Sequence, residues 1–404
     1  MEKILNGIEI LNRIENFKTG VLSNFYYLKQ KHFKRMEILL FLLLTIVWPL
    51  RWLWQQCSSK KMASKTRKAP AWQICQESIR DNMKSSLLWA SSQDYTDMWT
   101  RDTFFASWGL SPEVSRAFID TIASFQREDG LIPLYIGRGN ACCKMFCKQR
   151  PSGPIRPVYS DAKTGDCPTD SCFQFIIMAH DIYPEKSKKA WKYMQSRVVD
   201  GLVYETGLGT WQDTIKHRGH VAYTNILYYK AASLLYPTHA RVILTHLVDK
   251  LWTGQYFKCS TTNSSFGQVD NALALLYDIA PVQRGIRTIL SRQTWTSPPN
   301  LIPGSRKKPF RFDEVYLPCY PLGNAEYHQS WAWSWVYLLV RKALKDMDLK
   351  PCEDQIKKYG SLYETYDKFG PIKRVLYQSQ PNFSEACGVY LDIVQKQISL
   401  AFKW

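Results

Sequence analysis

The chain has 404 residues, of which 45% are hydrophobic and 22% charged, a composition typical of one large globular domain or two ordinary ones. Its net charge of +18 would suit a nucleic-acid partner, but residues 1–70 alone hold 13 Lys/Arg against 4 Asp/Glu, half of that excess. The remaining chain shows no zinc-finger spacing, RNP-like aromatic motif or continuous basic helix. We therefore expect no nucleic-acid partner.

The N-terminal region divides into three parts. Residues 1–35 form a basic tail, residues 36–56 a candidate transmembrane or signal-anchor helix, and residues 57–71 a polar, basic linker. The uncharged run from Ile38 to Leu50 would span about 20 Å as a helix, less than the roughly 30 Å of a hydrocarbon core. A marginal span continues past Arg51, so we expect a membrane-associated protein. The segment could instead be a signal-peptide core or a buried amphipathic helix, and the protein would be cytoplasmic if residues 36–56 are not an anchor.

The body, residues 72–404, shows apolar residues at spacings of three and four again and again, which predicts about twelve helices. No short alternating strands are expected, so the predicted fold class is all-α. Four longer loops are rich in Gly, Pro and polar residues: 128–168, 200–215, 256–267 and 293–325. Because loops carry binding and catalytic residues disproportionately often, we expect a site there.

The Gly-rich loop "YETGLGTWQDTIKH", residues 204–217, presents Trp211 and Asp213. A carboxyl group beside an indole is partly desolvated, which raises its pKa and suits a general acid at neutral pH. The plainer interpretation makes Asp213 the N-cap of a following helix. Glu205, in the same loop, is an alternative acid.

Two further segments offer candidate residues. In "QPNFSEACGVY", Glu385 follows a Pro-containing loop at a helix start, where a carboxylate also simply complements the helix dipole. In "NAEYHQSWAWSWVY", residues 324–337, His328 and Trp331 could line a sugar ring or fill a core.

The segment "DYTDMWTRDTFF" combines acids with aromatic residues. Thr100 or Asp97 could cap a helix there. Alternatively, Asp102 beside Arg101 could accept hydrogen bonds from ligand hydroxyls while Trp99 stacks on the sugar, because sugars are held by polar groups on an aromatic floor.

Taken in order, "WTRD", "QREDGLIPLYIG", "GTWQDT", "QVDNALALL", "YHQSWAWSW" and a Glu near the C-terminus resemble the six-hairpin glycosidases. The similarity covers about residues 75–395 and is greatest to the amylo-α-1,6-glucosidase part of glycogen-debranching enzymes. It implies an (α/α)6 barrel over residues 72–404. It also implies Asp213 as general acid and Glu385 as general base. The substrate-binding residues that it implies are Trp99, Arg101, Asp102, Trp211, His328 and Trp331.

The resemblance further implies a glycoside hydrolase that cleaves a terminal, α-glucosidic bond of an oligo- or polysaccharide with inversion. In that mechanism the two carboxyl groups lie about 6.5–9.5 Å apart. No metal or other cofactor is expected. The alternatives are a non-catalytic carbohydrate-binding or scaffold protein on the same barrel, and an all-α membrane-attached interaction module. The sugar, the membrane orientation, the Cys pairing and the oligomeric state are not predicted.

Overall fold

The computed structural model describes residues 69–401 apart from 85, 139–153, 162, 280, 282, 306, 321–322, 347 and 374–376. The predicted basic tail (1–35), the predicted membrane helix (36–56) and most of the linker therefore lie outside the described residues. Among the helices that are described, none is long and apolar enough to cross a membrane. Seven cysteines fall in the described part, and all are free thiols.

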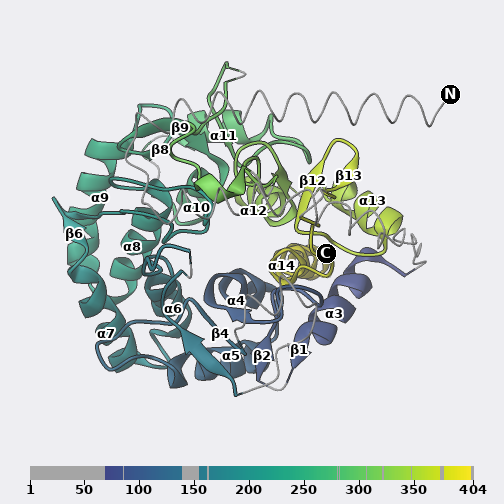
Figure 1. Cartoon of the computed structure of the whole chain (residues 1–404), viewed down its shortest axis with the longest axis horizontal. Coiled ribbons are helices and arrows are strands. Elements are labelled where there is room, and N and C mark those ends of the chain that lie inside the picture. The colour runs from purple at the N-terminus through teal and green to yellow at the C-terminus, as the bar shows by residue number, and fades with distance from the viewer. Residues whose placement is uncertain are drawn as a thin grey trace.

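Twelve α-helices of the described residues form two nested rings (Figure 1). The inner ring consists of α4 (Thr100–Ala106), α6 (Ser171–Ala179), α8 (Ala222–Leu235), α10 (Gln268–Leu276), α12 (Ser334–Leu344) and α14 (Ser384–Ala401). Each inner helix contacts the next, and α14 contacts α4, so this ring is closed. The outer ring consists of α3 (Ala71–Asn82), α5 (Pro112–Ser124), α7 (Pro184–Gln195), α9 (Pro237–Leu251), α11 (Gln283–Leu290) and α13 (Lys350–Tyr359).

The two rings differ in their sequence patterns. Outer helices are amphipathic and bury one stripe, as α11 does with Ile286 and Leu290. Three of them begin with proline at the first helical position, where its missing N–H costs nothing, and Ser111 caps α5 through the amide of Val114. Inner helices pack on both sides, so α12 is buried from Ser334 through Arg341.

The all-α prediction is wrong in one respect, because the described residues also contain thirteen short strands in five antiparallel sheets. The sheets are β1 (Met83–Lys84) with β2 (Leu87–Leu88), β3 (Met98–Trp99) with β4 (Tyr135–Gly137) and β5 (Arg156–Val158), β6 (Val198–Val199) with β7 (Leu202–Val203), β8 (Lys258–Ser260) with β9 (Asn263–Gly267) and β10 (Asn300–Leu301), and β11 (Ala332–Trp333) with β12 (Thr365–Asp367) and β13 (Gly370–Pro371). Strands of two to five residues are too short to show an alternating pattern in the sequence.

The connections between helices are markedly unequal. An inner helix reaches the next outer helix through a short link; α8 ends at Leu235 and α9 begins at Pro237. An outer helix returns to the inner ring through a long segment that contains the strands, and β3, β9 and β11 lead directly into α4, α10 and α12. The long segments and the N-terminal turns of the inner helices therefore offer the most room for a site.

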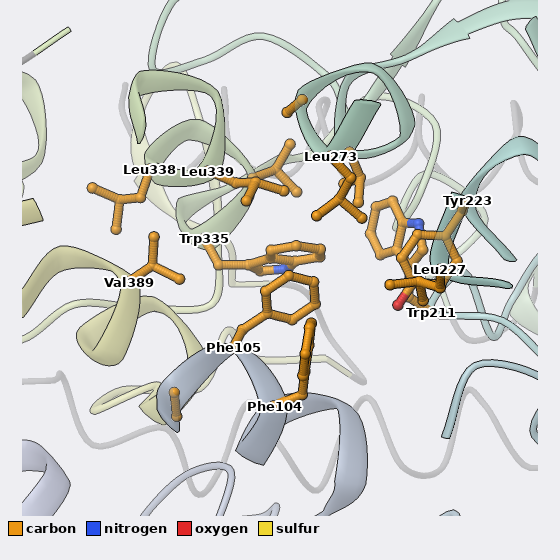
Figure 2. Close-up of a cluster of buried hydrophobic side chains, with 14 of the residues drawn as sticks. Phe104, Phe105, Trp211, Tyr223, Leu227, Leu273, Trp335, Leu338, Leu339 and Val389 are labelled. Carbon is orange, nitrogen blue, oxygen red and sulfur yellow. The ribbon is translucent and has the colours of Figure 1, made fainter. Parts of the chain in front are cut away.

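Aromatic side chains join the inner helices at the centre of the ring (Figure 2). Phe105 of α4 lies against Trp335 of α12, with 4.8 Å between ring centroids. Burying each such side chain contributes about 1.5–3 kcal/mol. Trp211 meets Trp335 edge to face at 5.2 Å, so the core also anchors the loop that carries Asp213.

Candidate active site

The first turn of α4 is joined to the start of α6 by a buried ion pair. Arg101 Nε donates to Asp170 Oδ2 at 2.7 Å, and Tyr223 OH donates to the same oxygen at 3.3 Å. Asp170 is fully buried, and its Oδ1 has no hydrogen-bond partner within the described part of the chain. Arg101 therefore neutralises Asp170 and brings the N-terminal ends of two inner helices together.

Asp102 and Glu385 are two buried carboxyl groups close to this ion pair. Burial raises the pKa of Asp102 to about 7; Arg101 opposes this, while Asp213 and Asp170 reinforce it. Burial, with the nearby Asp102, also raises the pKa of Glu385 well above its usual value. Glu385 is 3% exposed, and its Oε1 has no partner among the residues described. Simple dipole complementation needs a charged carboxylate, which this burial disfavours.

Asp213 is held by Lys163, a residue that the sequence did not single out. Lys163 Nζ lies 3.0 Å from Asp213 Oδ2 and 2.7 Å from its backbone oxygen. The two side chains are 32% and 31% exposed. Burial alone would raise the pKa of Asp213, but the Lys163 ammonium group beside it and, less strongly, Arg101 lower it. The expected increase in this pKa is therefore wrong in sign. The capping interpretation also fails, because the next helix, α8, begins only at Ala222.

Glu205, the alternative acid, has different surroundings. Its Oε1 accepts hydrogen bonds from Thr169 Oγ1 at 2.5 Å and Thr224 Oγ1 at 2.6 Å. Burial raises its pKa to about 7, the two threonines lower it, and its charged neighbours are Asp170 and Arg197. Glu205 therefore ties the segment before α6 to α8.

Two of the predicted substrate-binding residues, Trp211 and His328, are in direct contact. The His328 ring stacks on Trp333 at 5.0 Å, and Trp211 meets both rings edge to face. Thr214 Oγ1 is hydrogen-bonded to His328 Nδ1 at 2.7 Å, and burial lowers the pKa of His328 to about 3, so this ring is neutral. Trp331 packs against a tyrosine ring and is 3% exposed.

Trp99 differs from the other predicted aromatic residues because it is only partly buried. It ends β3, opposite Tyr135 of β4, and the two ring centroids are 4.7 Å apart. Of the three tryptophans predicted to bind sugar, Trp99 thus has the most accessible face.

The sequence analysis missed Glu364, in "SLYETYD". Apolar residues continue at spacings of three and four from Ile356 through Tyr366, a helical pattern, but α13 ends at Tyr359, with Gly360 in a left-handed conformation (φ 69°). A glycine in that position is a common helix stop, and it was the available signal. Glu364 then precedes β12, and its backbone oxygen accepts from the amide of Ser334 at the start of α12.

Two tyrosines hold the Glu364 side chain. Tyr327 OH donates to Oε1, and Tyr377 OH donates to Oε2 at 2.7 Å. Burial raises the pKa of Glu364 to about 8; both tyrosines lower it, whereas Asp102 and Asp213 raise it. Glu364 therefore lies within electrostatic reach of Asp213.

This arrangement combines a carboxylate whose pKa is lowered with carboxyl groups whose pKa values are raised. Asp213 has the lowered pKa, while Asp102, Glu364 and Glu385 have raised pKa values. Such a set can donate a proton and activate water within one site. Within the residues described, no group of three or more His, Cys, Asp and Glu side chains could hold a metal ion.

No family model matches the sequence, and no curated protein matches it either. Solved structures do match. A glycosidase variant in complex with glucose is 13% identical, with 81% of this chain and 96% of that chain covered and a TM-score of 0.53. The GH63 mannosylglycerate hydrolase from Thermus thermophilus, in complex with Tris and D-glycerate, is 11% identical, with 80% and 99% covered and a TM-score of 0.53. The chain therefore has the fold of these glycosidases.

Proposed function

We propose that this protein is a glycoside hydrolase whose catalytic carboxyl groups are Asp213 and Glu364. The observation that carries the proposal is a chain of contacts between them: Tyr327 donates to Glu364, its ring lies 4.6 Å from His328, and His328 is hydrogen-bonded to Thr214, next to Asp213. The pKa shifts of the two carboxyl groups are opposite. The pKa of Asp213 is lowered despite burial, whereas burial raises that of Glu364 to about 8. Hydrolysis with inversion needs one carboxylic acid and one carboxylate across the scissile bond.

Glu364 is preferred to the predicted base Glu385 because of its neighbours. Asp213 is among the charged groups that act on Glu364, whereas Asp102 and Arg101 act most strongly on Glu385. Glu364 also receives its hydrogen bonds from Tyr327 and Tyr377, whose rings contact Trp333 and Trp331 respectively.

The direction of proton transfer has two competing indications. The sequence resemblance makes Asp213 the proton donor, whereas the unliganded site leaves the proton on Glu364. Chemical rescue separates them. A variant without the acid keeps activity on glycosides with good leaving groups, while azide restores turnover to a variant without the base.

The finer specificity is also part of the proposal. We infer a terminal α-glucosidic bond in an oligo- or polysaccharide, cleaved with inversion as in amylo-α-1,6-glucosidases. The motif order supports this, as does a structural neighbour in complex with glucose. NMR of the freshly released sugar tests inversion, because a β-anomer from an α-glucoside is the inverted product.

The decisive experiment follows sugar release from gluco-, manno- and rhamno-oligosaccharides by the parent and by four variants: Asp213→Asn, Glu364→Gln, Glu385→Gln and Glu205→Gln. We expect the first two to lose at least about 10³-fold in kcat, as expected when a catalytic group is removed. Glu205→Gln should keep most of its kcat. Unchanged turnover in Asp213→Asn or Glu364→Gln would refute the pair. A parent that binds oligosaccharides without turnover would instead be a carbohydrate-binding protein.

A further inference from the structure

Lys163 makes three polar contacts beside the candidate catalytic pair. Its Nζ lies 3.0 Å from Asp213 Oδ2, 2.7 Å from Asp213 O and 3.4 Å from Asp161 Oδ2. Lys163 therefore donates hydrogen bonds to both the side chain and the backbone of Asp213. A lysine on an open surface would make such contacts only transiently, because holding its long side chain costs rotamer entropy.

The loop around Lys163 is built to keep it in place. The Lys163 amide donates to Asp161 Oδ1 at 2.7 Å, which folds the loop on itself. Asp166 Oδ2 accepts from the Leu208 amide at 3.0 Å, which joins this loop to the one that carries Asp213. A Cβ on Gly207 would lie 2.0 Å from that carboxylate oxygen, so this close approach depends on glycine.

We propose that Lys163 is a positioning residue for Asp213: its ammonium group fixes the Asp213 side chain and keeps that carboxylate ionised in the resting protein. Its consequence for catalysis rests on the proposed function, but its effect on Asp213 is measurable without substrate. The other titratable or charged groups that act on Asp213, or on which Asp213 acts, are Tyr95, Arg101, Asp102, Asp161, Cys319, Tyr327, His328 and Glu364.

Those other groups cannot replace Lys163. Burial raises the pKa of Asp213, so an ionised carboxylate needs a cation close to it. His328 is neutral because burial lowers its pKa to about 3. Arg101 is charged but already donates to Asp170. Removing the Lys163 charge should therefore raise the pKa of Asp213.

The direct test is a carboxyl ¹³C-NMR titration of the whole chain labelled with [4-¹³C]aspartate, with the Asp213 signal identified by its loss in Asp213→Asn. Lys163→Met keeps most of the side-chain length and removes the charge, while Lys163→Arg keeps the charge. Lys188→Met removes an exposed ion pair with Glu185 on α7 and serves as the matched control. Circular dichroism checks that each variant is folded.

We expect the Asp213 midpoint to move to higher pH in Lys163→Met and to stay near the parent value in Lys163→Arg and Lys188→Met. The limb of the pH–rate profile that belongs to Asp213 should move the same way: the alkaline limb if Asp213 is the acid, the acidic limb if it is the base. An unchanged midpoint in folded Lys163→Met overturns the proposal. A raised midpoint in a protein that hydrolyses no glycoside leaves it standing and refutes the proposed function instead.

Discussion

Replacing Arg101 with methionine should destabilise the protein strongly. Its partner Asp170 is fully buried, and Arg101 Nε is the closest group that donates to its carboxylate. Without Arg101, the described residues offer that fully buried carboxylate one side-chain donor, Tyr223 OH at 3.3 Å. Removing one partner of a buried ion pair costs about 3–5 kcal/mol, because the remaining charge is left uncompensated.

The second half of the same experiment removes both charges. Arg101→Met combined with Asp170→Asn leaves no buried charge, so we expect the double variant to recover part of the loss. Urea unfolding followed by far-UV circular dichroism measures these changes as shifts in midpoint at a constant slope. The control is Arg116→Met, since Arg116 pairs with Asp120 at 2.6 Å but both side chains are about half exposed, 50% and 46%.

An exposed pair contributes about 0–1 kcal/mol, so the loss in the free energy of unfolding should be severalfold larger for Arg101→Met than for Arg116→Met. If Arg101→Met lowers the free energy of unfolding no more than Arg116→Met does, the Arg101–Asp170 pair does not stabilise the contact between α4 and α6, and the reasoning is refuted. If the double variant is less stable than Arg101→Met, the buried charge is not the source of the loss.

Three further predictions concern pH and packing. Tyr377→Phe removes a hydrogen bond that lowers the pKa of Glu364, so the Glu364 limb of the pH–rate profile should move to higher pH. Burial raises the pKa of Asp270 from 3.8 to about 7, so the folded state binds this proton more tightly, and stability falls as pH rises from about 4 to 7. Asp270→Asn should reduce this pH-dependent loss in the free energy of unfolding by about 2–4 kcal/mol, measured by urea unfolding at several pH values. An unchanged pH dependence would contradict the prediction. Gly388→Ala should lower the urea midpoint despite better helix propensity, because the new Cβ would lie 2.3 Å from the Ala106 oxygen; an unchanged midpoint would show that the helices can separate.

The helices were predictable because their apolar residues recur over two or more turns. The loops that carry Lys163, Glu205 and Asp213 were also visible in the sequence, since glycine, proline and polar residues interrupt the helical pattern there, whereas the loop that carries Glu364 was not. The short strands were not predictable, because pairs such as Trp333 with Thr365 join segments about thirty residues apart. Their pairing depends on the closed ring and leaves no local pattern.

Individual roles within the site were less accessible to sequence reasoning. The pKa of Asp213 depends on Lys163, which is 50 residues away in the chain, so the burial argument based on Trp211 gave the wrong sign. Glu364 was hidden in an apparent helical repeat that runs past the stop at Gly360. An electrostatic partner that the fold brings close decides the first case, and a local helix stop decides the second.

The ring also explains how so many carboxyl groups can be held together. Helix N-termini carry a partial positive charge, and Asp102, Asp270 and Glu385 each lie in the first turn of an inner helix. Asp102 and Asp270 receive backbone hydrogen bonds there that lower their pKa values, against the larger effect of burial. Asp213 lies on a loop outside any helix, so a side-chain cation has to supply that compensation. Lys163 is therefore a point at which a single substitution should change the protonation of Asp213 without changing the barrel.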